Sequence, residues 1–256
     1  MAAFQAGKRI RFFIGLHHPC DCQHFDAAFV SVNAIRQRKG PFAVQDWILD
    51  SGAFTELSTH GGYRHSVDEY ATQIRRWKSN GNLLAAVSQD YMCEPWILEK
   101  TGLTVEDHQR LTIERYDALL RCDTGCYIMP VLQGYAPQDY ARHIEMYGDR
   151  LAPGMWVGVG SVCKRNGDPR AIEAVLLAIY HRRPDLRLHG FGLKKTALAS
   201  GVVQELLFSA DSMAWSYAAR REGRDRHSWH EAERYRNQVE SRPVQVPLAF
   251  MFDRSG

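Results

Sequence analysis

The sequence lacks the features of a membrane protein or a secreted protein. No apolar run approaches the ~20 residues that a membrane-spanning helix needs. Residues 1–7 have no basic flank followed by an apolar core, so no signal peptide is expected. Six cysteines without a secretory context are predicted to be reduced thiols rather than a disulfide framework. These absences predict a cytoplasmic protein with no membrane partner.

The sequence also lacks a strong charge imbalance, a domain linker and a nucleotide-binding glycine fingerprint. A formal net charge of +3 is too small to argue for a nucleic-acid partner by itself. The first apolar run is followed by His17-His18-Pro19, where a dinucleotide-binding fold would carry a glycine-rich turn. Without low-complexity stretches, the 256 residues are predicted to form a single domain over 1–256.

Short apolar runs that end in turn residues recur along the chain and predict strands. Seven are clear: 11–16, 47–50, 83–87, 127–132, 155–160, 186–191 and 206–209. An eighth, 244–250, is weakened by its prolines. Helical spacing or capping predicts helices at 25–39, 66–80, 104–120, from 137 onward, 170–181, 195–204 and 229–239. This alternation predicts an α/β fold, a compact (β/α)8 barrel of TIM type, with an open doubly wound sheet as the alternative.

One strand end draws attention first. The run Trp47-Ile48-Leu49 leads directly into Asp50, which small residues follow. A carboxylate at the end of a buried strand is costly unless it is paired or used. Glycine behind it lets another molecule approach the backbone closely. The alternative is an aspartate that only caps a turn.

Polar or bare strand ends recur, and in a barrel the active site lies at the C-terminal ends of the strands. They are Asp50, Asp90, Gln133, Gly158 with Gly160, His189 with Gly190, and Asp211. Aspartate and glutamine side chains suit the edge of a nitrogen heterocycle, and the nearby aromatics Phe54 and Tyr91 suit its faces. The remaining carboxylates suit glycosyl transfer through a covalent intermediate. Such a reaction needs no metal and no cofactor, and we predict none.

A histidine- and cysteine-rich loop follows the first strand. It contains His17, His18, Cys20, Cys22 and His24. The spacing in Cys20-Asp21-Cys22 is wrong for a zinc knuckle. We therefore favour residues that line a site or the surface over metal ligands.

The ordered strand-end motifs resemble the tRNA-guanine transglycosylase superfamily over roughly residues 10 to 220. The motifs are Asp50-Ser51-Gly52-Ala53-Phe54, Gln89-Asp90-Tyr91-Met92-Cys93-Glu94-Pro95, Val131-Leu132-Gln133-Gly134, Val157-Gly158-Val159-Gly160, His189-Gly190-Phe191-Gly192 and Ala210-Asp211-Ser212. Within the superfamily the chain looks most similar to the deazapurine DNA base transglycosylases of bacteria and their phages. These exchange guanine in DNA for a free 7-deazaguanine base, such as 7-cyano-7-deazaguanine.

The resemblance implies specific roles. Asp211 would be the nucleophile that takes the deoxyribose C1′, and Asp50 the acid and base that exchanges protons with the purines. The base-binding set would be Asp90, Gln133, Gly134, Phe54, Ser51, Gly158, Gly160, His189 and Gly190. Two departures stand out. No cysteine follows Cys163, so the C-terminal zinc subdomain of the tRNA enzymes is absent, and Ala53 replaces a motif glycine.

Basic residues follow three successive strands and are a plausible phosphate track. They are Lys164 and Arg165, Lys194 and Lys195, and Arg220 and Arg221. The partner expected from the resemblance is double-stranded DNA with a flipped guanine, together with the free base. An accessory protein is possible, and both monomer and homodimer stay open. The alternatives are the same exchange on tRNA, and a barrel that binds nucleobases or nucleic acid without catalysis.

Overall fold

The computed structural model describes residues 10–165 and 167–241, and its nine strands form one parallel sheet. The strands are β1 (Arg11–Gly15), β2 (Ala27–Ser31), β3 (Asp46–Asp50), β4 (Asn82–Val87), β5 (Ile128–Met129), β6 (Val131–Leu132), β7 (Trp156–Val159), β8 (Arg187–Gly190) and β9 (Leu207–Ser212). Their order is β5-β4-β3-β2-β1-β9-β8-β7-β6. The two ends of this order are neighbours in the chain.

Pro130 joins those two ends. Proline has no backbone N–H to donate, so the strand pairing is interrupted there. On one side, Ser88 N–H donates to the Met129 carbonyl at 3.0 Å, and on the other Gly158 N–H donates to the Pro130 carbonyl at 2.8 Å. Residues 128–132 therefore act as one strand that bridges both edges, and the sheet closes into a barrel of eight strand positions. The predicted (β/α)8 barrel is confirmed.

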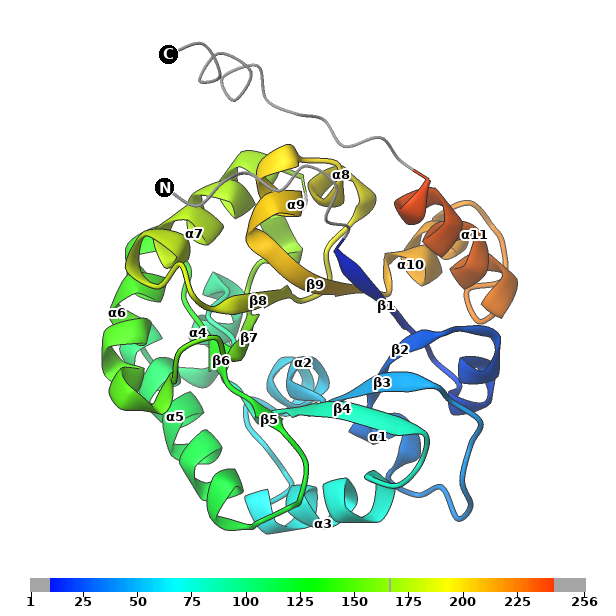
Figure 1. The fold of residues 1–256 in the computed structure, drawn as a ribbon, viewed down its shortest axis with the longest axis horizontal. Helices are drawn as coiled ribbons and strands as arrows, with labels where there is room; N and C mark the ends of the chain where they lie inside the picture. Colours follow the sequence, from blue (N-terminus) through cyan, green and yellow to red (C-terminus); the bar gives the residue numbers. More distant parts are fainter. Residues whose placement is uncertain (1–9, 166, 242–256) are drawn as a thin grey trace.

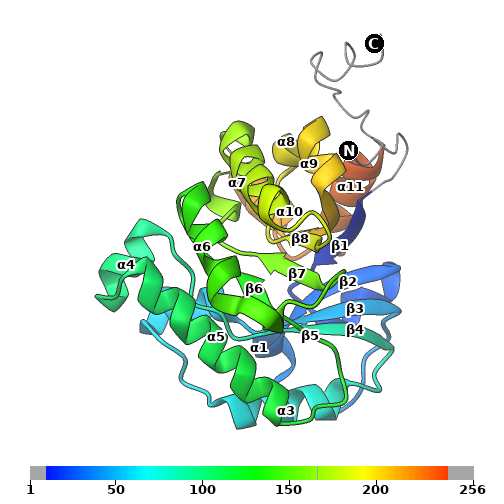
Figure 2. The same cartoon turned by 60° about the vertical axis from the view of Figure 1, so that its left-hand side comes forward.

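Helices surround the ring of strands, as Figures 1 and 2 show. They are α1 (Val32–Ile35), α2 (Ala53–Thr55), α3 (Val67–Trp77), α4 (Pro95–Thr101), α5 (Val105–Arg121), α6 (Pro137–Tyr147), α7 (Pro169–Arg182), α8 (Lys195–Leu198), α9 (Gly201–Leu206), α10 (Ala214–Arg221) and α11 (Trp229–Glu240). A π-helical turn, Glu56–His60, continues α2, and 3-10 turns span Pro19–His24, Gly148–Arg150 and Cys163–Arg165. None of the helices in the described ranges is long and apolar enough to cross a membrane.

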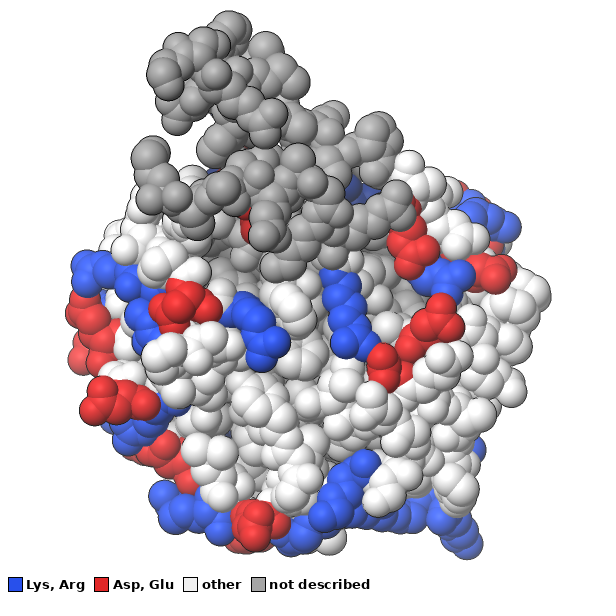
Figure 3. Space-filling model, viewed as in Figure 1, with Lys and Arg blue, Asp and Glu red and all other residues white. Residues whose placement is uncertain are grey.

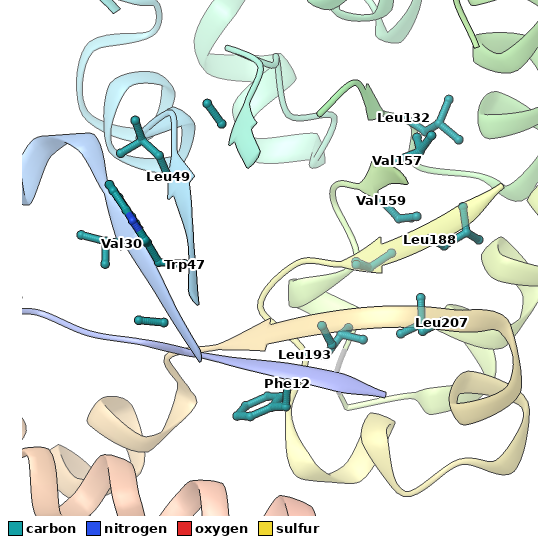
Figure 4. Close-up of a cluster of buried hydrophobic side chains, with 14 of the residues drawn as sticks. Phe12, Val30, Trp47, Leu49, Leu132, Val157, Val159, Leu188, Leu193 and Leu207 are labelled. Atoms are coloured by element: carbon teal, nitrogen blue, oxygen red, sulfur yellow. The ribbon is translucent and has the colours of Figure 1, made fainter. Parts of the chain in front are cut away.

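Side chains alternate between two apolar layers, because successive residues of a strand point to opposite faces. Phe13 and Ile48 belong to the cluster that fills the barrel interior. Their neighbours Phe12, Trp47 and Leu49 belong to the larger cluster between strands and helices, part of which Figure 4 shows. The same alternation places Asp50, two residues after Ile48, on the interior side.

One predicted helix is wrong. Residues 25–39 contain the strand β2, with only the short α1 after it. Ala28 and Val30 are fully buried on one side of β2, and Val30 pairs with Leu49 of β3. This strand supplies the barrel position that the sequence assigned to 244–250, a segment outside the described residues.

The other predicted elements are found, with shifts at their ends. The helix predicted at 195–204 is two short helices, α8 and α9. Ser200 ends the first and caps the second, where its hydroxyl accepts from Val203 N–H. The helices α4 and α10 were not predicted. α10 begins two residues after the end of β9, whereas α4 follows β4 after the connecting residues 88–94.

Candidate active site

Asp50 ends β3 at the mouth of the barrel. Its carboxylate accepts a hydrogen bond of 3.1 Å from Gly52 N–H. Gly52 has φ +78°, a left-handed conformation that favours glycine, and a Cβ there would lie 2.5 Å from Asn33 Nδ2. The glycine thus lets the backbone turn back onto the carboxylate. The pattern of small residues after Asp50 has a local cause.

Asp90 and Gln133 form a buried pair between the ends of β4 and β6. The Gln133 Nε2 donates to the Asp90 carboxylate, and Gln133 is 0% exposed and Asp90 6%. Gln109 Nε2 donates to the Gln133 carbonyl at 2.7 Å, and the Gln133 backbone N–H donates to His143 Nδ1 at 2.8 Å. The carboxamide is therefore held in one place before any ligand arrives.

Ser161 belongs to this network and was missed in the sequence. Its hydroxyl lies 2.8 Å from Gln133 Oε1 and 2.9 Å from Glu94 Oε2, and its single proton can be donated to either. It also accepts from Cys93 N–H at 2.8 Å. Ser161 has φ +53°, a conformation that costs a non-glycine residue about 1–2 kcal/mol. Its place directly after Gly160 at a strand end was the available signal.

Asp211 lies on β9 and is 5% exposed. Its Oδ1 is 3.2 Å from His189 Nε2 and accepts from Gly192 N–H at 3.1 Å. The other ring nitrogen, His189 Nδ1, is 2.8 Å from Ser209 Oγ. His189 has no exposed surface and both of its nitrogens contact the protein, so its predicted contact with a base stays a prediction.

The three aspartates influence one another across the mouth. Burial raises the pKa of Asp50 to about 6, and the nearby Asp211 carboxylate adds to the rise. Burial also raises the pKa of Asp90 to about 7; the hydrogen bond from Gln133 opposes this and Asp50 reinforces it. Carboxyl groups whose pKa values lie near neutrality can hold or release a proton there, which is typical of acid–base sites.

The glycines predicted to bind the base fall into two groups, according to which atoms a Cβ at each position would meet. A Cβ at Gly160 would lie 2.1 Å from Gln133 Nε2, so this glycine makes room for a site residue. At Gly158, Gly190 and Gly134 the nearest atoms belong to Phe191, Leu193 and Asp139, at 2.4, 2.6 and 2.6 Å. Close packing within the protein therefore accounts for these three glycines. Their contact with a base stays a prediction.

Exposed aromatic rings follow four of the strands: Phe54 after β3, Trp96 after β4, Tyr135 after β6 and Tyr217 after β9. Phe54, in α2 after β3, is 49% exposed and packs edge-on against Trp96 at 6.2 Å. Tyr135 follows β6 and is 44% exposed, and Tyr217, in the first turn of α10 after β9, is 57% exposed. Ser51, between Asp50 and Gly52, is buried.

Cations accompany two of these rings. The Arg165 guanidinium lies 4.4 Å from the Tyr135 ring centre. Lys194 Nζ and the Arg221 guanidinium approach Tyr217 at 5.8 and 6.0 Å, so the structure brings two of the predicted basic loops together. We call the set Arg165, Tyr135, Lys194, Tyr217 and Arg221 the aromatic–cationic rim.

The other predicted basic residues lie differently. Lys195 turns toward α11, where it contacts Gln238 and the Tyr235 ring at 5.3 Å. Arg220 is exposed, and the Lys164 side chain lies outside what the structure describes. Figure 3 shows one face of the molecule, on which Lys and Arg lie among Asp and Glu along the left edge and gather at the lower right.

The histidine-rich loop after β1 packs against the segment that precedes α11. His17 lies 2.7 Å from Ser216 Oγ, and its ring is 4.8 Å from that of His227. His24 stacks on Trp229 at 3.9 Å. Across residues 10–165 and 167–241, no three His, Cys, Asp or Glu side chains are grouped so that they could hold a metal ion. Packing accounts for these rings.

The fold and the site together define a parallel (β/α)8 barrel with three interacting carboxylates and a buried carboxamide at its C-terminal mouth. The family model DpdA, described as DeoxyPurine in DNA protein A, matches residues 8–232. The chain belongs to this family. No curated protein matches the chain.

Proposed function

We propose that the protein exchanges guanine in DNA for a free 7-deazaguanine base through a covalent glycosyl-aspartate intermediate on Asp211. Membership of a family described by deoxypurine in DNA supports DNA as the substrate. The observation that carries the chemistry is the placement of Asp50 beside Asp211, close enough that Asp211 raises the pKa of Asp50. Two carboxylates across one site are the usual apparatus of glycosyl transfer with retention.

In the first half-reaction, a lone pair of the Asp211 carboxylate forms a bond to C1′ of the deoxyribose. The C1′–N9 bond breaks, and its electron pair goes to the guanine. Asp50, in its protonated form, donates a proton to the departing guanine, which leaves as a neutral base. A pKa of about 6 lets Asp50 supply this proton near neutral pH.

The second half-reaction reverses these steps with the new base. The Asp50 carboxylate removes the N9 proton of the free 7-deazaguanine. N9 then attacks C1′, the bond between C1′ and Asp211 breaks, and its electron pair returns to the carboxylate. Asp50 ends protonated and Asp211 ionised, as both began, so the enzyme is ready for the next exchange.

Asp90 and Gln133 would select the base. The guanine edge presents two N–H donors beside one carbonyl acceptor, and 7-deazaguanine presents the same edge. A carboxylate accepts from both donors, and a carboxamide can serve the acceptor. Asp90 and Gln133 are already hydrogen-bonded to each other and buried, which suits them to read a flat base edge. Phe54 would stack on the ring face.

The aromatic–cationic rim would hold the DNA strand beside the flipped nucleotide. Stacking of a base on an aromatic side chain contributes about 1–3 kcal/mol, and the cations neutralise neighbouring phosphates. A guanine in duplex DNA must leave the helix to reach a barrel interior. Tyr135 and Tyr217 follow different strand ends, so they suit nucleotides on either side of the flipped one.

The test is base exchange. The protein is incubated with DNA that carries labelled guanine and with 7-cyano-7-deazaguanine, and the nucleosides are analysed. We expect labelled guanine to be released and the deazapurine to appear in DNA, and Asp211→Asn to do neither. Exchange into tRNA but not DNA would favour the tRNA alternative, and binding without exchange on any substrate would favour a non-catalytic barrel.

A further inference from the structure

His189 and Asp211 form a buried dyad whose hydrogen bonds have a readable direction. We propose that His189 is a positioning residue, fixed as the Nε2–H tautomer, that holds Asp211 Oδ1 and leaves Oδ2 as the atom that bonds to C1′. The proposed role rests on the proposed function; the tautomer itself rests on the hydrogen bonds alone.

The direction starts at Trp156. An indole N–H can only donate, and Trp156 Nε1 donates to Ser209 Oγ at 2.8 Å. The Ser209 hydroxyl therefore has its own proton left for a second partner, and His189 Nδ1 lies 2.8 Å away. If Ser209 donates to Nδ1, that nitrogen carries no proton. The remaining proton of a neutral imidazole must then be on Nε2.

The other end of the ring agrees with this assignment. Nε2 lies 3.2 Å from Asp211 Oδ1, and an Nε2–H makes this a hydrogen bond to the carboxylate. The opposite tautomer would set an imidazole lone pair against a carboxylate oxygen, which is costly because His189 has no exposed surface. In a doubly protonated ring, Nδ1 would carry a proton and could not accept the hydrogen bond from the Ser209 hydroxyl.

Aromatic packing keeps the imidazole in this orientation. The His189 ring stacks on Phe29 with an interplanar angle of 14° and a centroid separation of 5.7 Å. Phe191 approaches it edge-on at 4.9 Å, and Phe13 at 6.1 Å. With no exposed surface, the ring cannot rotate without disturbing these neighbours.

Two donors converge on one oxygen of the nucleophile. His189 Nε2 and Gly192 N–H both reach Asp211 Oδ1, and over the described part of the chain no hydrogen bond reaches Oδ2. Hydrogen bonds make Oδ1 the less nucleophilic oxygen. When Oδ2 bonds to C1′, Oδ1 becomes the ester carbonyl and keeps both donors. The same donors stabilise the carboxylate that departs when the new base attacks, as in an oxyanion site.

The first experiment needs no substrate. Long-range 1H–15N correlation spectra of histidine-labelled protein identify His189 by the loss of its signals in His189→Gln. We expect the Nε2–H tautomer in the wild-type protein. An Nδ1–H tautomer or a doubly protonated ring would overturn the assignment, whatever the protein's activity.

The second experiment measures, in a single turnover, the transfer of the deoxyribosyl group from preformed Asp211 adduct to the incoming base, because negative charge returns to the Asp211 carboxylate in that step. DNA affinity is measured separately. Removal of a preorganised donor to a developing charge typically costs about 10²–10³-fold in rate. We expect a loss of this order in His189→Phe, a recovery of at least tenfold in His189→Gln, which keeps an N–H donor, and unchanged DNA affinity in both. Equal rates in the two variants, at matched thermal stability, would overturn the positioning role. A wild-type protein that forms no adduct would instead overturn the proposed function.

Discussion

Gly160 makes room for Gln133: a Cβ on this glycine would lie 2.1 Å from Gln133 Nε2 and 2.5 Å from its Cδ. The backbone of one strand end thus fixes where the carboxamide of another can sit. Gln133 also donates to Asp90. Gly160 therefore indirectly determines the positions of Gln133 and Asp90, the two residues that we propose bind the edge of the base.

We therefore expect Gly160→Ala to displace the carboxamide. Loss of one hydrogen bond to a buried polar group costs about 1–3 kcal/mol, so kcat/KM for the free base should fall roughly 5- to 150-fold. The measurement is steady-state base exchange. Gly167→Ala is the matched control, because nothing lies within 4 Å of a Cβ there and this change should leave exchange intact. Normal kinetics in Gly160→Ala would contradict the proposed role of Gln133.

Asp90 should make the stability of the protein depend on pH. Its pKa is raised by burial to about 7, so the stability that the protonated group supplies is present below its usual pKa of 3.8 and is lost as the pH rises through 7. Asp90→Asn should accordingly raise the unfolding free energy relative to wild type more at pH 8 than at pH 4. The difference is a few kcal/mol at most, since one pKa unit corresponds to about 1.4 kcal/mol.

Glu56→Gln provides the control of opposite sign. The unfolding free energies of both variants and of the wild type are measured by urea unfolding at each pH. The Arg64 guanidinium lowers the pKa of Glu56 to about 2, so this carboxylate stabilises the fold above its usual pKa of 4.5 and loses that effect as the pH falls through 2. Its variant should be less stable than wild type at pH 8. If the unfolding free energies of Asp90→Asn and wild type differed by the same amount at every pH, the pKa of Asp90 would not be raised in the folded protein.

The aromatic–cationic rim should be visible in the salt dependence of DNA binding. Each phosphate contact contributes about one unit to the slope of log affinity against log salt, so Arg221→Gln should weaken binding and reduce the slope by about 1. Tyr217→Ala should weaken binding with little change of slope. Arg182→Gln, at the end of α7 beside Glu145, should change neither. Equal slopes in Arg221→Gln and wild type would place the DNA elsewhere.

The barrel could be predicted from the sequence because strand ends repeat, but β2 could not. Phe25, Phe29, Val32 and Ile35 have the spacing of a helix, and the strand occupies only Ala27–Ser31 among them. Pairing with the neighbouring strands makes this segment a strand: Ile14 of β1 pairs with Ala28, and Leu49 of β3 pairs with Val30. Such contacts between distant segments override local spacing.

The site divides in the same way. Asp50 and Gln133 could be found because a polar side chain at the end of an apolar run is visible in the sequence. Ser209 lies two residues before Asp211 and therefore on the same face of β9, so strand alternation could have indicated it. The hydrogen bond from Trp156 to Ser209 could not be predicted from the sequence. It joins β7 to β9, and β8 lies between these two strands in the sequence. The orientation of Trp156 depends on the closed barrel.

The most direct test of the account is capture of the covalent intermediate. The protein is incubated with guanine-containing DNA without the incoming base, denatured and digested, and the peptides are analysed by mass spectrometry. We expect a deoxyribosyl adduct on Asp211, none in Asp211→Asn, and slower formation in Asp50→Asn. An adduct on another residue, or guanine exchange that proceeds at the wild-type rate in Asp211→Asn, would contradict the account.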